Sequence, residues 1–314
     1  MIEYSKNQLS LAAKQHGFVR DTFEKVLRLK EILKFLNTDD YLQEHLALKG
    51  GTAINMTIFN LPRLSVDIDV DFIPNVNRNE LEADREKVSR IIKEFMQEEG
   101  YTLAPASRYS FSLDALYFQY QNTGGNRDVL KIEINYSLRE HIFSLTRRKI
   151  LTDVFDDNFD VLTVAPMEIF AAKANALMSR AAARDLYDFN NMIDFGIFDE
   201  SEQEMLKKSI IFYHTISRES IDRTFDTAAI DRLSFDKIRR DLFPVLRKKE
   251  HFDLESRKNS AKQYLHDLLC LTDKEKEYLI AFEQKEYVPE LLFEDTDILE
   301  RLMTHPMALW KCRR

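Results

Sequence analysis

The sequence predicts an α+β protein in which a mixed β-sheet with flanking helices is followed by a mainly α-helical bundle. β-like runs alternate with helical runs before Pro166, whereas nearly all of the chain after it carries apolar and charged residues at helical spacing. The 314 residues include seven Gly and seven Pro, and so few of these favour many helices and few loops. We therefore expect an α/β domain over residues 1–160 and a mainly helical domain over residues 161–314.

Each expected element follows from its apolar periodicity and from the turn residues that bound it. In the first part these elements are helices over residues 6–15, 21–36, 53–59 and 79–98, an apolar piece over 45–49, and strands over 66–73, 101–104, 115–121, 129–136 and 161–164. In the second part they are helices over residues 167–179, 183–195, 202–216, 235–240, 260–269, 273–281 and 295–303. The order of helix, strand, long helix and further strands fits a sheet with helices packed on it.

The composition is that of a globular protein, with 44% hydrophobic and 31% charged residues. Two cysteines, Cys270 and Cys312, exclude a disulfide framework and a Cys-rich zinc site. The first residues lack a signal-peptide pattern, and no apolar run approaches the roughly 20 residues that a membrane-spanning helix needs. We therefore expect a cytoplasmic protein that makes no membrane contact.

The net charge of −8 does not predict a general attraction to nucleic acid. Any such contact would need a local basic patch, and a solvated helix end is the competing interpretation of each short basic run. The candidate runs are Arg147-Arg148-Lys149, Arg239-Arg240, Arg247-Lys248-Lys249 and Arg313-Arg314.

Acidic and apolar residues alternate over residues 63–72. Because side chains along a strand point to opposite faces in turn, one face is apolar and the other carries carboxylates. The apolar face holds Val66, Ile68, Val70 and Phe72, and the polar face holds Arg63, Ser65, Asp67, Asp69 and Asp71. Like charges roughly 7 Å apart repel, and a bound Mg²⁺ or Mn²⁺ would remove this conflict with hard oxygen ligands. An exposed strand with a solvated acidic face is the alternative, although Asp is disfavoured in strands.

A glycine pair, Gly50-Gly51, stands just upstream of this strand and before an expected helix. Such a pair lets backbone N–H groups approach a phosphate, and the positive end of the helix dipole adds attraction. Thr52 could donate to a phosphate oxygen or cap the helix, and a plain turn with a capping Thr is the alternative. The spacing differs from that of a Walker loop.

A later strand places Lys131, Glu133 and Asn135 on its polar face. If this strand neighbours the acidic one, Glu133 becomes a third carboxylate, which could bind a second metal ion or act as general base on an attacking hydroxyl. A solvent-facing Glu on an amphipathic strand is the alternative.

Lys173, Arg180, Arg184 and Asp188 are spaced seven, four and four residues apart. On one continuous helix these offsets place all four on one face, with Asp185 pointing away. Such a row suits a triphosphate or an RNA backbone, and Asp188 would orient Lys173 or an Arg. A break near Ser179 would weaken this argument, and a surface salt-bridge ladder is the alternative.

Together these residues resemble the AbiEii/AbiGii-type toxins, also called MenT-like, of the nucleotidyltransferase superfamily. The superfamily signature is a Gly-Gly/Ser pair, then Asp-x-Asp on a strand, then a third carboxylate on a later strand, and the toxin branch adds a helical Lys followed by Arg-Asp-x-x-Asp. The matching pieces are Gly50-Gly51-Thr52, Asp67-Ile68-Asp69, Glu133, Lys173 and Arg184-Asp185-Leu186-Tyr187-Asp188.

The resemblance implies a nucleotidyltransferase-type mixed sheet and a toxin with a cognate antitoxin protein as partner. It implies metal-dependent transfer of NMP from an NTP to RNA, with the tRNA acceptor end as the expected target. The expected catalytic residues are Asp67, Asp69, Glu133, Lys173 and Asp188, with Mg²⁺ or Mn²⁺ on Asp67 and Asp69. The expected nucleotide-binding residues are Gly50, Gly51, Thr52, Arg63, Ser65, Arg180 and Arg184. Helical phase favours Asp188 over Asp185, and a contribution from Asp71 stays open.

Two other functions fit the same residues. One is a small-molecule nucleotidyltransferase that modifies an antibiotic or a metabolite. The other is an NTP-dependent protein kinase or an NTP-binding module. The label of an α- or γ-labelled NTP, and the molecule that receives it, distinguishes these possibilities.

Overall fold

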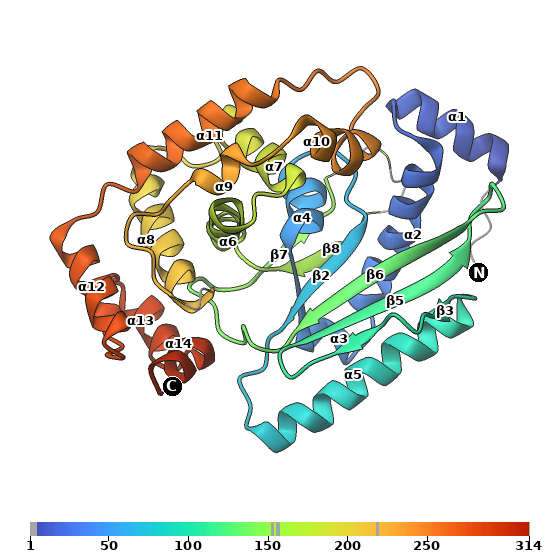
Figure 1. The fold of residues 1–314 in the computed structure, drawn as a ribbon. Coiled ribbons are helices and arrows are strands. Elements are labelled where there is room, and N and C mark those ends of the chain that lie inside the picture. The colour runs from blue at the N-terminus through green and yellow to red at the C-terminus, as the bar shows by residue number, and fades with distance from the viewer. Residues whose placement is uncertain (1–4, 152–153, 155–157, 218–219, 314) are drawn as a thin grey trace. The chain divides into compact units, whose positions relative to one another are not determined.

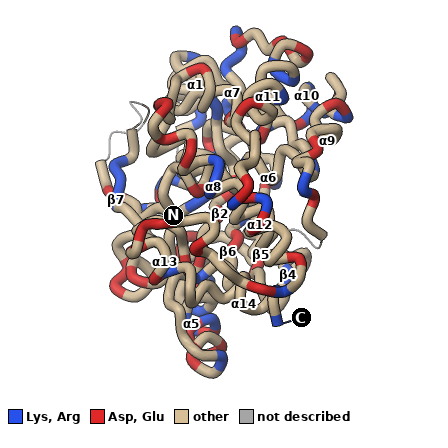
Figure 2. The backbone as a smooth tube through the Cα atoms, turned by 90° about the vertical axis from the view of Figure 1, so that its left-hand side faces the viewer, with Lys and Arg blue, Asp and Glu red and all other residues tan. Residues whose placement is uncertain are grey.

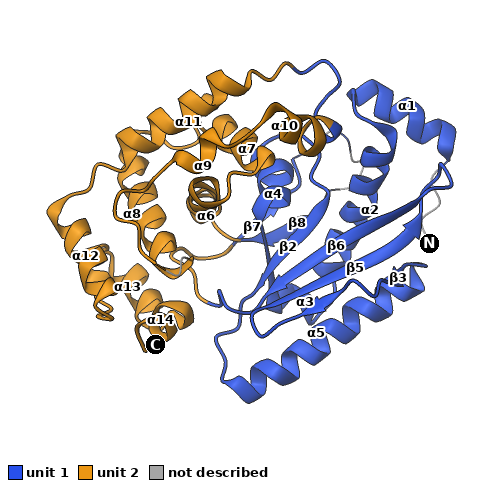
Figure 3. Ribbon diagram, in the orientation of Figure 1, with its two compact units in different colours: residues 1–139, 146–163, 244–250 blue, residues 140–145, 164–243, 251–314 orange. Residues whose placement is uncertain are grey.

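The computed structural model describes residues 5–151, 154, 158–217 and 220–313. The chain forms two compact units (Figure 3). Unit 1 contains residues 1–139, 146–163 and 244–250, and unit 2 contains residues 140–145, 164–243 and 251–314.

Unit 1 combines helices with a mixed sheet (Figure 1). Its helical elements are α1 (Lys6–His16), α2 (Arg20–Leu36), α3 (Leu42–His45), α4 (Gly50–Ala53), the π-helical turn η1 (Ile54–Ile58) and α5 (Arg78–Glu98). Its strands are β1 (Leu46–Lys49), β2 (Asp67–Phe72), β3 (Thr102–Leu103), β4 (Arg108–Tyr109), β5 (Leu113–Gln121), β6 (Arg127–Asn135), β7 (Thr146–Lys149) and β8 (Asp160–Thr163).

In the described residues the eight strands form one sheet with the order β3-β5-β6-β2-β1-β8-β7, and β4 pairs with β5. β2 lies between β1, to which it is antiparallel, and β6, to which it is parallel. The sheet is therefore mixed, and the α+β class is confirmed. The acidic strand is central in the sheet and not at an edge, so one of its faces must pack and the other must carry the charges.

The apolar face of β2 forms part of the unit 1 core. Ile68, Val70 and Phe72 are at most 2% exposed. The Phe72 ring lies 5.4 Å from that of Tyr136, which follows β6. Burying large apolar side chains here fixes the strand, because a one-residue slip would turn them out and the carboxylates in.

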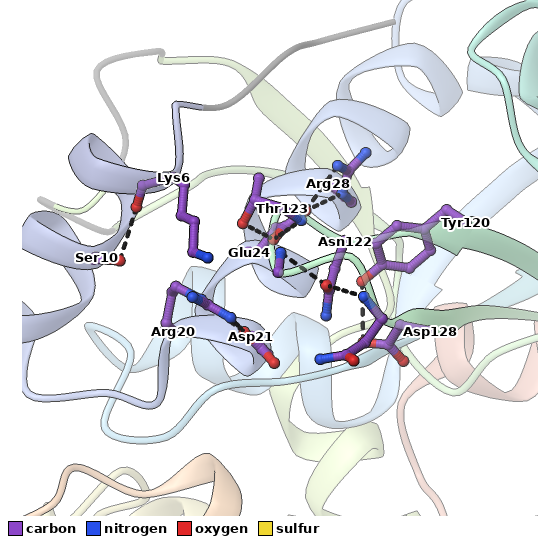
Figure 4. Close-up of polar contacts among 12 residues, drawn as sticks. Lys6, Ser10, Arg20, Asp21, Glu24, Arg28, Tyr120, Asn122, Thr123 and Asp128 are labelled. Atoms are coloured by element: carbon purple, nitrogen blue, oxygen red, sulfur yellow. Dashed lines mark hydrogen bonds and ion pairs between the residues drawn. The ribbon is translucent and has the colours of Figure 1, made fainter.

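The β5–β6 hairpin is anchored to α2 by a buried carboxylate (Figure 4). Glu24 accepts hydrogen bonds from the Thr123 backbone N–H at 3.0 Å and from Arg28 Nη2 at 2.7 Å. The Arg28 guanidinium lies 4.6 Å from the ring centroid of Tyr120, whose hydroxyl donates to Asp128 at 3.1 Å. These contacts hold β6, and therefore its polar face, in place beside β2.

Unit 2 is helical apart from its connecting loops (Figure 1). The loop of residues 140–145 is fixed to α6 (Pro166–Ser179) by Glu168, which accepts from the backbone N–H groups of Ile142 and Phe143 at 3.0 and 2.9 Å. The α-helices are α6 (Pro166–Ser179), α7 (Ala183–Asp194), α8 (Glu200–Ser217), α9 (Ala228–Asp231), α10 (Phe235–Asp241), α11 (Leu254–Leu268), α12 (Asp273–Glu283), α13 (Thr296–Met303) and α14 (Pro306–Arg313). Two short 3₁₀ turns, η2 (Phe243–Val245) and η3 (Pro289–Leu291), complete the described elements, although η2 runs into unit 1.

Some element boundaries differ from expectation. The helix expected from residue 53 begins at Gly50, and the helix expected from residue 260 begins at Leu254, where Asp253 caps it by accepting from the Ser256 N–H at 3.1 Å. The basic run Arg147-Arg148-Lys149, for which a solvated helix end was the competing interpretation, lies instead in strand β7. Short polar strands such as β7 lack the apolar alternation by which a strand is recognised.

Candidate active site

The register between β2 and β6 brings three predicted carboxylates onto one sheet face. Asp69 is the direct partner of Glu133, and Asp67 is the partner of Lys131. Partnered residues on neighbouring strands point to the same face and are about 4.8 Å apart across the sheet. Asp67, Asp69, Lys131 and Glu133 therefore form a two-by-two group, which we call the acidic group.

Electrostatic conflict is concentrated at Asp69. Burial, with repulsion from Glu133 and Asp67, raises the pKa of Asp69 from 3.8 to about 6, although Lys49 and Lys131 act in the opposite direction. A half-buried carboxylate beside two others is more stable when protonated or when a cation is added. The site therefore favours binding of a positive charge, and such perturbed groups are typical of active sites.

Asp71, the third Asp of the strand, is balanced within the protein. Its carboxylate is 2% exposed, pairs with the Lys49 ammonium and accepts from Asn135 Nδ2 at 2.8 Å. Asn135 is also its partner in the sheet register. Asp71 thus differs from Asp69, because Asp71 accepts from a lysine and an amide whereas Asp69 lies among other carboxylates. Lys49 could not be predicted from the sequence as the partner of Asp71, because 22 residues separate the two.

The glycine pair lies against the acidic strand. Gly50 has a φ of +68°, and a Cβ on it would lie 2.8 Å from Asp69 Oδ2. A Cβ on Gly51 would lie 2.7 Å from Arg63 Nη2 and 3.4 Å from Ser65 Oγ. A side chain at either position would force these groups to shift, and at Gly50 glycine adopts the left-handed conformation without the strain that other residues incur. The predicted nucleotide-binding residues of unit 1 are therefore gathered where β1 ends and β2 begins.

Thr52 does not cap the helix. The N-cap position is Lys49, with no capping hydrogen bond from its side chain. The buried Thr52 hydroxyl instead contacts the Ser65 hydroxyl at 2.8 Å and the backbone carbonyl of Asp67. Both Ser65 and Arg63 are also buried, and Arg63 Nη1 donates to the Leu64 carbonyl at 2.9 Å. The Thr52 hydroxyl therefore holds the helix that follows the glycine pair to Ser65 and to the start of β2.

Unit 2 contains a buried lysine with two carboxylates. Lys173 Nζ on α6 lies 3.0 Å from Asp185 Oδ1 and 3.0 Å from Asp188 Oδ2, both on α7. All three side chains are at most 10% exposed. Asp188 contacts Lys173 as proposed from the sequence, and Asp185 does so equally. We call this the lysine centre.

The prediction that Lys173, Arg180, Arg184 and Asp188 share one helical face was wrong, because α6 and α7 are separate helices. α6 ends at Ser179, Arg180 is its C-cap, and Ala181 has a φ of +45°. Because of this turn, the side chains of α7 do not point where one continuous helix would place them. Asp185 therefore points toward Lys173 and not away from it. Arg180 is 72% exposed and reaches Asp185 at 3.5 Å, whereas Arg184 lies in the first turn of α7.

The donor set of unit 1 fits a hard divalent ion that shares its coordination with substrate. Among the described residues, no group of three His, Cys, Asp or Glu side chains is arranged to hold a metal ion unaided. Mg²⁺ in nucleotide sites is commonly held by one or two carboxylates together with phosphate oxygens and water. Asp67 and Asp69 provide such a pair, and their repulsion is the feature that a cation would relieve.

A mixed sheet that carries Asp-x-Asp beside a third carboxylate, with a glycine pair directly after the neighbouring strand β1, defines the class of nucleotidyltransferases. Residues 34–267 match the family described as nucleotidyl transferase AbiEii toxin, type IV toxin–antitoxin system. The chain belongs to this family, and it is a nucleotidyltransferase toxin.

The fold is also similar to that of a solved structure. MenT4, a nucleotidyltransferase toxin from Mycobacterium tuberculosis H37Rv, superimposes with a TM-score of 0.68 at 14% sequence identity, covering 96% of this chain and 99% of that one. No curated protein sequence matches the chain. In the part of the chain that is described, no helix has the length and apolar character needed to cross a bilayer.

Proposed function

We propose that this toxin transfers NMP from an NTP to RNA, at the acceptor end of tRNA, and that it uses Mg²⁺ or Mn²⁺ held by Asp67 and Asp69. The proposal rests mainly on the register that places Glu133 beside Asp69, with Asp67 two residues away on the same face. Three carboxylates at this spacing can both attract a metal-bound triphosphate and accept a proton, which are the two tasks of the reaction.

The residues of unit 1 divide these tasks between them. Asp67 and Asp69 would hold the ion, which when bound polarises the phosphate that is attacked. Glu133 would accept the proton of the acceptor hydroxyl. Gly50 and Gly51 would let backbone N–H groups approach the phosphates, since any side chain at either position would fill that space. Thr52, Arg63 and Ser65 would support the phosphate site by holding the glycine turn against the start of β2.

The basic residues of unit 2 are proposed to stabilise negative charge on the phosphates of the nucleotide. Lys173 would offset the negative charge that develops on the leaving pyrophosphate, oriented by Asp185 and Asp188, each 3.0 Å from its ammonium. Arg180 and Arg184 are proposed to bind phosphates of the nucleotide, because their guanidinium groups offer paired donors to phosphate oxygens.

An exposed face of α10 and η2 in unit 2 supports RNA as the acceptor. Phe235 and Phe243 are 55% and 37% exposed, and their rings pack edge to face at 5.7 Å. Exposed cations stand among them, with Arg239 and Arg240 at 71% and 72% exposure and Lys237 also exposed. Aromatic platforms among cations bind single-stranded nucleic acid by stacking and by phosphate contacts.

This face lies beside the start of α7. Hydrogen bonding from Arg240, with attraction from Arg184 and Lys237, lowers the pKa of Asp241 at the end of α10. Cations of α10 and α7 therefore lie near one carboxylate. Elsewhere along the backbone, basic and acidic positions are interspersed (Figure 2), and the net charge is −8. A local patch of this kind is what RNA binding by an acidic protein needs.

The proposal is tested by incubating the protein with each α-labelled NTP, Mg²⁺ and total tRNA. We expect label on the RNA, and its loss by more than about a thousandfold in Asp67→Ala, since removing a ligand of the reacting phosphate removes transition-state stabilisation. Asp67→Ala should unfold at the same denaturant concentration as the parent or higher. Full activity of Asp67→Ala contradicts the site. Label on a small molecule, or γ-label on protein, contradicts the RNA acceptor.

The RNA face is tested by direct binding without NTP. Lys237→Ala/Arg240→Ala should weaken tRNA binding by about tenfold at 0.1 M salt and reduce its salt dependence. The matched control is Lys274→Ala/Lys276→Ala, which removes two exposed cations of α12 that also pair with carboxylates. Equal loss in both double variants would mean that α10 has no special role.

A further inference from the structure

Lys131 is the only cation of the acidic group, and the catalytic scheme above gives it no role. It is the register partner of Asp67, and it precedes Glu133 by two residues on the same face of β6. Its Nζ lies 2.8 Å from Glu133 Oε2, and both side chains are about one quarter exposed, at 26% and 27%. The ammonium is therefore held among carboxylates but remains within reach of solvent and of an incoming ligand.

The charge on Lys131 is maintained by its neighbours. Burial alone would lower the pKa of its ammonium, but the hydrogen bond to Glu133 and the attraction of Glu133, Asp67 and Asp69 outweigh burial and raise that pKa. Lys49, a second cation that acts on this group, pairs with Asp71. Lys131 is thus a counter-ion of Glu133, and it also attracts Asp67, in the protein without ligand.

Binding of a metal-bound triphosphate would change what Lys131 faces. A divalent ion on Asp67 and Asp69 would supply the positive charge that these carboxylates lack and would repel the ammonium. The triphosphate at the same time brings an anion for which the flexible lysine can leave Glu133. When the lysine leaves, the Glu133 carboxylate loses an opposite charge and becomes a stronger base for the proton of the acceptor hydroxyl.

We propose that Lys131 is a nucleotide-binding residue that exchanges partners. It neutralises Glu133 and Asp67 in the free protein and moves to a phosphate of the NTP when the metal-bound nucleotide enters. This inference rests on the proposed function and adds to it a specific ligand of the triphosphate. It has a consequence that a purely structural ion pair lacks: Lys131 competes with the metal ion but assists the nucleotide, so its removal should change the two affinities in opposite directions.

The experiment measures both affinities in the full-length protein by calorimetry, with Mn²⁺ alone and then with NTP in the presence of metal. Lys131→Met should bind Mn²⁺ several-fold more tightly than the parent, because the competing ammonium is gone. It should bind NTP about tenfold more weakly, as expected for loss of a charge-assisted hydrogen bond. Lys131→Arg, which keeps the charge, should restore NTP binding to within a few-fold.

The matched control is Lys25→Met. Lys25 on α2 pairs with Asp128 on β6 at 3.0 Å and is 18% exposed, so it is a lysine–carboxylate pair of similar burial outside the acidic group. Lys25→Met should change neither affinity. Parallel loss of Mn²⁺ and NTP binding in Lys131→Met, or no change in either, overturns the inference while the proposed function stands. Absence of metal-dependent NTP binding by the parent protein overturns the proposed function, and the inference with it.

Discussion

The acidic group of unit 1 and the lysine centre of unit 2 both bring several charges together, but they balance them differently. In the lysine centre one ammonium lies 3.0 Å from each of two carboxylates, and all three side chains are nearly excluded from water. In the acidic group three carboxylates share a face with one lysine, and the pKa of Asp69 rises to about 6. The lysine centre is thus held together by its own charges, whereas the acidic group carries a repulsion that a bound cation would remove.

This difference predicts opposite effects on stability when a charge is removed. Taking the cation from the lysine centre leaves two buried carboxylates facing each other, which is among the costliest changes that a protein core can undergo. Taking a carboxylate from the acidic group relieves repulsion. Both changes should abolish NMP transfer, so stability and activity together distinguish the two regions.

The largest effect is expected for Lys173→Met. Removing one partner of a buried ion pair costs about 3–5 kcal/mol of unfolding free energy, measured by urea denaturation. Lys258→Met is the control, because Lys258 is also nearly buried but its partner Glu255 is 74% exposed and can be solvated when the lysine is gone. The control should lose about 1 kcal/mol or less of charge interaction, in addition to the packing loss that both variants share.

A second variant separates folding from catalysis in the lysine centre. Lys173→Met/Asp185→Asn/Asp188→Asn carries no net buried charge, and it should recover most of the lost stability. It should not recover NMP transfer if Lys173 acts on the pyrophosphate. Recovery of activity in the triple variant would show that the lysine centre serves the fold alone.

Asp69→Asn is expected to have the second-largest effect on stability, with the opposite sign. The folded-state pKa of about 6 lies above the ordinary value of 3.8, so the folded protein binds more protons than the unfolded chain in this window. The parent protein therefore loses stability as pH rises from about 4 to above 6, and Asp69→Asn avoids that loss. The variant should match the parent near pH 3.8 and exceed it by up to about 3 kcal/mol at pH 7.5.

The measurement is a series of denaturation curves between pH 4 and 8 with chelator present, so that no divalent ion stabilises the parent. A variant less stable than the parent at pH 7.5 would mean that Asp69 is held by attractive contacts, as Asp71 is. The same protein should show no NMP transfer at any of these pH values.

Strand alternation and helix periodicity were sufficient to predict much of this arrangement. The face shared by Asp67 and Asp69 follows from the period-two pattern of residues 63–72, and the parallel pairing with Glu133 was the one condition that the sequence could state but not decide. Contacts across long sequence separations could not be predicted, such as Lys49 with Asp71. The end of one helix at residue 179 and the start of the next at residue 183 were expected, but the left-handed conformation of Ala181 was not, because Ser179-Arg180-Ala181-Ala182 contains neither Gly nor Pro, the residues that usually mark such a turn.

Gly50→Ala should have the smallest effect on stability and tests how closely the acidic group is packed. A φ of +68° costs an alanine about 1–2 kcal/mol, since its Cβ meets its own backbone. Gly125, in the β5–β6 turn, has a φ of +83° with nothing within 4 Å of an added Cβ. Gly125→Ala should therefore lose a similar amount of stability through backbone strain alone, and it is the matched control.

The two alanine variants should differ in activity. The Cβ at position 50 would lie 2.8 Å from Asp69 Oδ2, so the carboxylate must move away from the glycine turn. We expect NMP transfer to fall by at least about tenfold in Gly50→Ala, since small displacements of a ligand in a preorganised site carry large kinetic costs. Gly125→Ala should retain the parent rate. Equal activity in the two variants would mean that the Asp69 carboxylate can shift without loss of function. The acidic group would then tolerate displacement of one of its carboxylates.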